Sequence, residues 1–117
     1  MSPDLDRSGK QGAERRTAPR YPVDLDVEIE WGSATLKGHG RDIGISGLFI
    51  ATPEPLWLNA RFAAKLLAES PILLDCVVRR IEPGIGMGVQ IAPSNDDARL
   101  LLVALIESLA ARLAARP

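Results

Sequence analysis

Residues 23–31 alternate strictly between apolar and acidic side chains. The apolar positions are Val23, Leu25, Val27, Ile29 and Trp31, and the acidic positions are Asp24, Asp26, Glu28 and Glu30. Because successive side chains of a strand point to opposite faces, this period of two predicts a β-strand with one dry face and one wet face. Such a strand needs other strands or a helix to cover its dry face.

Further strand signals follow at short intervals. They lie at residues 35–37, 48–51, 60–66, 72–81 and 86–92. Pro53 and Pro55 end the second of these, and Pro83 and Gly84 are typical of a turn between the last two. The segment 23–93 is therefore predicted to hold about six short strands.

From residue 95 the apolar period becomes helical, and a helix is predicted over residues 95–115. Ser94 and Asp97, three positions apart, resemble a capping box. The apolar stripe consists of Leu102, Leu105, Ile106, Leu109 and Leu113. We expect this stripe to belong to the core rather than to a docking surface for a partner helix. Short strands followed by one amphipathic helix indicate a small antiparallel barrel or sandwich whose open face the helix covers.

The chain has 117 residues, of which 46% are hydrophobic, enough for the core of one domain. Residues 1–13 are predicted to form a flexible arm, and residues 14–117 the domain, with a ligand loop over residues 14–22. No apolar run approaches the roughly 20 residues that a membrane span needs. With a single cysteine and no apolar leader, the chain is expected in the cytoplasm.

Patterns typical of catalysis or metal binding are missing from the sequence. His39 is the single histidine, whereas a metal site needs three or four ligands. Cys76 falls inside an apolar strand pattern, where an inert buried thiol is expected rather than a nucleophile. The glycine-rich segment 84–88 lacks the Lys-Ser/Thr of a phosphate loop and leads into a strand. We therefore expect neither an enzyme nor a protein with a metal or a cofactor.

Two short segments indicate a ligand site. Arg15, Arg16 and Arg20 precede the first strand within six positions, and guanidinium groups grip phosphate oxygens bidentately. In "DIGISGLFI" (42–50), the Asp42 carboxylate can accept from the N1 and N2 donors of a guanine, and the glycines let a flat base approach the backbone. Arginine also reads the O6 and N7 edge of guanine. Together the segments predict a phosphate and guanine site.

The two segments resemble the signature of the PilZ domain, which is R-x-x-x-R before the first strand and (D/N)-x-S-x-x-G after the second. Arg16 and Arg20 match the first element, and Asp42 and Gly47 match the ends of the second. The resemblance extends roughly over residues 14–115. It implies a mainly β fold, a six-stranded antiparallel barrel with a C-terminal α-helix, that binds cyclic di-GMP, a bacterial second messenger.

The implied cyclic di-GMP site consists of Arg15, Arg16, Arg20, Asp42, Gly44, Ser46 and Gly47. Gly44 stands where the family has serine, and the loss of one hydroxyl costs about 0.5–1.5 kcal/mol. Ser46 can share a face with position 44 and partly replace that hydroxyl. Unless Gly44 needs a positive φ, Gly44→Ser is expected to bind equally or more tightly. In PilZ relatives an arginine just before R-x-x-x-R is compatible with two stacked ligands, so Arg15 favours two ligands per chain.

The resemblance implies a non-enzymatic receptor that passes the signal to an effector protein, in motility, biofilm or surface-structure control. An alternative is a PilZ-like protein-interaction module that has lost nucleotide binding. A barrel that binds single-stranded DNA or RNA is disfavoured, because the net charge is −1 and aromatic residues make up 4% of the chain. The sequence identifies neither the effector nor the oligomeric state.

Overall fold

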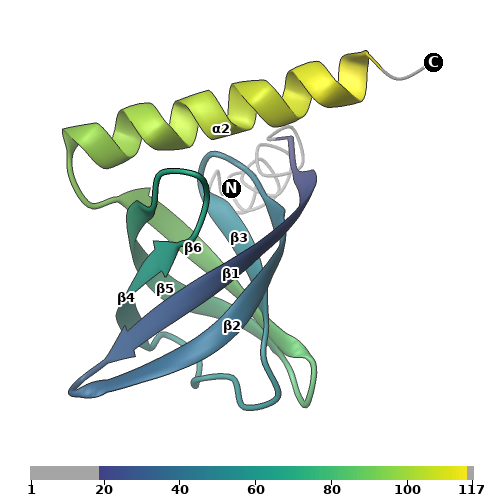
Figure 1. Cartoon of the computed structure of the whole chain (residues 1–117). Coiled ribbons are helices and arrows are strands. Elements are labelled where there is room, and N and C mark those ends of the chain that lie inside the picture. The colour runs from purple at the N-terminus through teal and green to yellow at the C-terminus, as the bar shows by residue number, and fades with distance from the viewer. Residues whose placement is uncertain (1–18, 116–117) are drawn as a thin grey trace, which may run out of the picture.

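The computed structural model describes residues 19–115, which form six strands and one helix. The elements are β1 (Tyr21–Trp31), β2 (Ala34–Ile43), β3 (Gly47–Ala51), β4 (Arg61–Leu66), β5 (Ile72–Glu82), β6 (Gly86–Pro93) and α2 (Asp96–Ala114). The strands close into a barrel in the order β1-β2-β3-β6-β5-β4, and all neighbouring pairs are antiparallel. Figure 1 shows α2 lying across one end of this barrel. The predicted six-stranded barrel with a C-terminal helix is confirmed.

β1 closes the barrel because it pairs with β2 along one edge and with β4 along the other. Its alternation places Val27 and Ile29 in the interior, while Asp24 and Asp26 face solvent. All six strands send aliphatic side chains into the same core. Burial of each large aliphatic side chain stabilises the fold by about 1.5–3 kcal/mol relative to an exposed one.

β2 is longer than the short strand expected near residues 35–37, since it continues through two glycines to Ile43. Gly38 does not break the strand but lets it pack closely on β3. A Cβ at Gly38 would lie 2.5 Å from Cγ2 of Ile50. The extension also pairs Asp42 with Pro22, near the start of β1. This pairing brings the two segments of the predicted site together.

The cap of α2 differs from the expected capping box of Ser94 and Asp97. Asn95 is the N-cap, and its Oδ1 accepts a hydrogen bond from the backbone N–H of Ala98 at 2.7 Å. The Ser94 hydroxyl instead donates to Asp75 on β5, at 3.2 Å. Asparagine caps helices as well as serine does, so sequence alone did not distinguish the two positions. The predicted cap was wrong by one residue.

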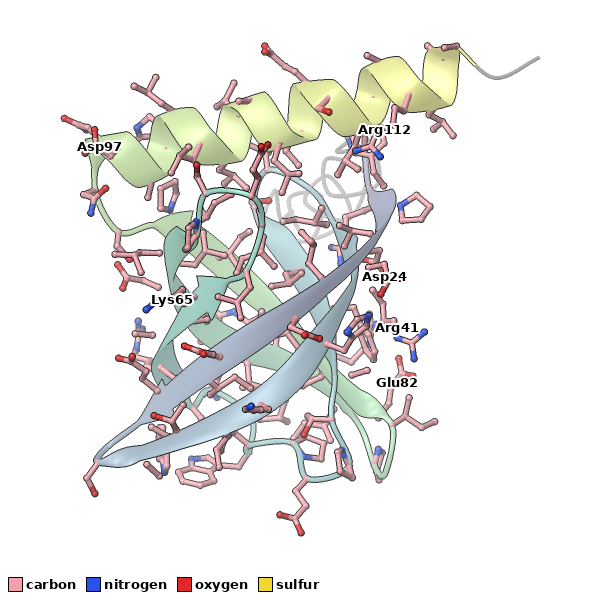
Figure 2. The ribbon with its side chains drawn as sticks, viewed as in Figure 1. Asp24, Arg41, Lys65, Glu82, Asp97 and Arg112 are labelled. Carbon is pink, nitrogen blue, oxygen red and sulfur yellow. The ribbon has the colours of Figure 1, made fainter. Side chains whose placement is uncertain are left out.

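The apolar stripe of α2 packs on the barrel over most of its length. Leu102 is fully buried, and Leu105, Ile106 and Leu109 pack against the core, as expected. Leu113 is 48% exposed. Figure 2 shows Arg112 near the start of β1, where it lines a shallow groove with Tyr21, Pro22, Leu109 and Leu113. No helix within residues 19–115 is long and apolar enough to cross a membrane.

Candidate functional site

A cavity of about 710 Å³ lies on the outer surface of the barrel, where the β2–β3 loop meets β6 and β5. One side, which we call the loop wall, consists of Arg20 and residues 44–47. The other, the strand wall, consists of Arg79, Arg80 and residues 88–90. Small-molecule sites have volumes of about 300–1,000 Å³, and the cavity falls within this range.

Arg20 and Asp42 form an ion pair beside the loop wall. The guanidinium donates from Nε and NH2 to Oδ1 of Asp42, at 2.9 and 2.6 Å. The register of the β1–β2 hairpin causes this contact, because Tyr21 pairs with Ile43 and Pro22 with Asp42. Both side chains are more than two-fifths exposed. Exposed pairs contribute about 0.2–1 kcal/mol, so a ligand can separate Arg20 from Asp42 at small cost.

The glycines of the loop wall make room for the chain that precedes β1. A Cβ at Gly44 would lie 2.5 Å from the carbonyl oxygen of Pro19 and 2.9 Å from Cδ of Arg20. A Cβ at Gly47 would lie 2.5 Å from NH1 of Arg20. The Arg20 side chain therefore rests directly on the glycine backbone.

Gly44 does not have a positive φ, so its backbone conformation is open to serine. There is no space for the serine side chain, however, because atoms of Pro19 and Arg20 occupy the position of a side chain at residue 44. The equal or tighter binding expected of Gly44→Ser stays a prediction. A serine would have to displace the segment that carries Arg20.

The β2–β3 loop is held in place by backbone hydrogen bonds at both ends of its turn. Gly44 N–H donates to the Gly47 carbonyl at 2.8 Å, and Ile91 N–H on β6 donates to the Ser46 carbonyl at 3.0 Å. Ser46 is exposed and lines the cavity together with Gly44. The backbone of residues 44–47 is thus held in place, and the loop presents one hydroxyl-bearing side chain.

The fold brings most of the predicted site residues into one place. Arg20, Gly44, Ser46 and Gly47 line the cavity, and Asp42 lies beside it through its ion pair with Arg20. Arg15 and Arg16 lie outside the described residues, as does the predicted arm over residues 1–13. Their assignment to the site stays a prediction.

The strand wall contains residues that sequence reasoning missed. Arg79 and Arg80 come from β5, and Gln90 comes from β6. A signal was present, because two consecutive arginines interrupt the alternation of "ILLDCVVRRI" (72–81). Alternation alone sends one of two consecutive side chains inward. The exposure of both arginines therefore required the three-dimensional pairing of β5 with β6.

His39 and Cys76 take no part in the cavity. The His39 ring contacts Asp26 at 3.0 Å and also Asp24, and these hydrogen bonds raise the pKa of His39 above 6.5. Figure 2 shows Asp24 on the outer side of the barrel. Burial raises the pKa of the Cys76 thiol to about 12, which keeps it protonated and unreactive at neutral pH. Among residues 19–115, no three His, Cys, Asp or Glu side chains are grouped to hold a metal ion.

Three solved structures share this fold. The motility inhibitor MotI/DgrA of Bacillus subtilis has a TM-score of 0.68 at 22% identity, over 87% of this chain and 53% of the inhibitor. The chain thus spans about half the length of that protein. The PilZ domain of CeSA from a cellulose-synthesising bacterium has a TM-score of 0.60 at 19% identity, over 80% of this chain and 99% of that domain.

The third structure is the PilZ domain of YcgR from Escherichia coli, solved with c-di-GMP. Its TM-score is 0.64 at 16% identity, over 85% of this chain and 94% of that one. No curated protein matches the sequence. The sequence profile of the PilZ domain matches residues 14–108, which include every strand of the barrel and most of α2. The chain therefore belongs to the PilZ domain family.

Proposed function

We propose that this protein is a receptor for cyclic di-GMP. The observation that carries the proposal is that Arg20 and the loop from Asp42 to Gly47, 22 residues and more apart in sequence, meet at one exposed cavity. These are the residues whose spacing matches the PilZ signature. Support also comes from the PilZ domain of YcgR, which has the same fold and was solved with c-di-GMP.

The chemistry of the loop wall suits a guanine nucleotide. The Asp42 carboxylate can accept from guanine N1 and N2, and arginine can bind a phosphate or the O6 and N7 edge. Gly44 and Gly47 leave the backbone open to a flat base once Arg20 moves off them. Arg16 adds a second guanidinium to the phosphates. Arg15 adds a third, which favours two stacked ligands per chain.

The receptor would act in the cytoplasm without catalysing a reaction, and would pass its state to an effector protein. The fold is shared with an inhibitor of motility and with a domain from a cellulose-synthesising bacterium. We therefore include motility and biofilm formation among the processes that it would control. The effector is to be found by capture with the protein in the presence and absence of cyclic di-GMP.

Calorimetric titration of the full chain tests the proposal. Cyclic di-GMP is expected to bind with a stoichiometry near two, and Arg15→Leu to lower the stoichiometry toward one. GTP and cyclic di-AMP serve as controls and are expected to bind far more weakly. Absence of cyclic di-GMP binding would contradict the receptor function, whereas a stoichiometry of one would contradict only the role of Arg15.

A second candidate is a PilZ-like protein-interaction module without nucleotide binding. It is favoured by Trp57 and Leu58 in the β3–β4 loop, which are 59% and 53% exposed. Trp57 stacks edge-on against Trp31 with ring centroids 4.8 Å apart, which fixes an exposed aromatic surface. The same titration separates the two candidates, because the module would bind no cyclic di-GMP.

A further inference from the structure

The strand wall depends on a β-bulge in β5. Val78 and Arg80 of β5 pair with two adjacent residues of β6, Val89 and Gly88. Arg79 is therefore an extra residue on β5, without a pairing partner on β6. In a regular strand, the inward positions Cys76 and Val78 would be followed by Arg80. The bulge instead leaves both arginines exposed on the outer surface. Bulges occur often next to functional sites, where they re-aim a side chain.

Arg79 is oriented by neutral side chains. Its Nε donates to Oε1 of Gln90 at 3.0 Å, and its NH1 donates to Oδ1 of Asn59 at 3.3 Å. These amides fix the direction of the guanidinium without neutralising its charge. An oriented guanidinium with a positive charge at the edge of a cavity suits an anionic ligand.

Arg80 is held by an aromatic ring and an exposed carboxylate. Its guanidinium carbon is 5.8 Å from the centre of the Phe49 ring, and NH2 is 3.2 Å from Oε2 of Glu82. The guanidinium also lies against Gly88, where a Cβ would be 3.5 Å from Cζ. The Arg80 side chain is still 63% exposed. It is therefore positioned on the barrel surface while one side stays open to a ligand.

The two walls form one continuous surface. Gly47 of the loop wall pairs with Gln90, and Arg80 pairs with Gly88, so β3, β6 and β5 carry the residues side by side. Among residues 19–115, three arginines and no carboxylate line the cavity. A surface of this kind fits a ligand with more than one anionic group, as a cyclic dinucleotide with two phosphates has.

We propose that Arg79 and Arg80 bind the nucleotide directly, at the strand wall, in addition to the arginines before β1. This inference rests on the proposed cyclic di-GMP function and adds ligand-binding residues outside the two signature segments. The bulge would then serve binding, because it turns Arg80 from the core to the cavity.

The test is a calorimetric titration of the full chain and its variants with cyclic di-GMP. Arg79→Ala and Arg80→Ala are each expected to weaken binding about 10-fold, and the double variant about 100-fold. Arg61→Ala is the matched control. Arg61 is an exposed arginine on β4, the other neighbour of β5, and does not line the cavity. Its loss is expected to change affinity less than twofold.

Nuclear magnetic resonance of the unmodified protein gives a readout that does not depend on the folding of variants. Cyclic di-GMP is expected to shift the Nε–H signals of Arg79 and Arg80 and the amide of Gly88. The inference is overturned, with the receptor function intact, if Arg20→Ala loses affinity while both strand-wall variants bind normally and these signals stay in place. If the unmodified protein does not bind cyclic di-GMP, the receptor function and this inference both fail.

Discussion

The two walls of the cavity hold their arginines in different ways. Arg20 is paired with a carboxylate, Asp42, and rests on the glycines of the loop. Arg79 is held by two neutral amides, and Arg80 by a phenyl ring and an exposed glutamate. For the proposed ligand to bind, the loop wall would have to break an ion pair and move a side chain. Arg79, by contrast, has no carboxylate partner within residues 19–115. The loop wall would thus rearrange on binding, whereas the arginines of the strand wall already have their orientation.

The largest effect is expected at the arginines of the signature. Arg20→Ala, and likewise Arg16→Ala, should weaken cyclic di-GMP binding by about 1.5–3 kcal/mol, since each removes charged hydrogen bonds to the ligand. The melting temperature should hardly change for Arg20→Ala, because Arg20 is exposed and its ion pair contributes little. Titration and thermal melting measure the two quantities. A strong loss of stability with intact affinity would make Arg20 a structural residue. The loop wall would then not rearrange when the ligand binds.

A smaller loss of cyclic di-GMP affinity is expected when a glycine of either wall is replaced by alanine. Gly44→Ala must displace Pro19 and Arg20, whose atoms lie 2.5 and 2.9 Å from the new Cβ, and should weaken binding about 3- to 10-fold. Gly44→Ser should bind more tightly than Gly44→Ala because its hydroxyl can donate to the ligand. Gly88→Ala makes the same change on the strand wall, where the new Cβ meets Arg80 at an ordinary 3.5 Å.

Titration of the three glycine variants, with circular dichroism to verify folding, decides between the walls. If Gly88→Ala weakens binding as much as Gly44→Ala, the strand wall is as tightly fitted as the loop wall. If Gly44→Ser binds more tightly than the unmodified protein, the segment before β1 moves away from residue 44 whenever ligand is bound. The second outcome would agree with the neutral or favourable effect expected from the sequence.

The smallest effect on binding is expected at His39, which belongs to neither wall. Hydrogen bonds to Asp26 and Asp24 raise the pKa of His39 above 6.5, so protonated His39 stabilises the folded state. This contribution is fully present below about pH 6.5 and is lost as the pH rises through the raised pKa. The melting temperature of the unmodified protein should exceed that of His39→Gln more at about pH 5.5 than at about pH 9. Affinity for cyclic di-GMP should be the same in both proteins, and an equal stability difference at both pH values would contradict the role of the ion pairs.

The sequence predicted those features that local pattern controls. A period of two identified β1, whose side chains alternate between core and solvent, and a helical period identified α2. The number of strands followed from turn residues and short apolar runs. Of the loop wall, Arg20, Gly44, Ser46 and Gly47 followed from side-chain chemistry and from the PilZ signature, whereas Ile45 was not singled out.

Other features depended on which strands become neighbours. Ser94 and Asn95 are both good caps, and only the packing of Ser94 against Asp75 distinguishes them. Gly44 was interpreted only as the loss of a serine hydroxyl, because the sequence does not show that the Pro19 carbonyl occupies the position of a side chain at residue 44. The length of β2 was underestimated, because glycine generally weakens a strand. Here the strand continues through Gly38, because Ile50 lies too close to leave room for a side chain.

By itself, the sequence determined where most of the strands and the helix lie, since these depend on residues near one another in the chain. The six-stranded barrel and most residues of the loop wall followed from the resemblance to the PilZ family. Only the tertiary structure decided that Arg20 meets Asp42 and that the β5 bulge exposes Arg79 and Arg80 beside them. Both depend on strand register, and a shift of one residue in register turns a side chain from the core to the surface. Register is set by the pairing of β1 with β2 and of β5 with β6 within the closed barrel, and so it is fixed by long-range contacts rather than by local sequence.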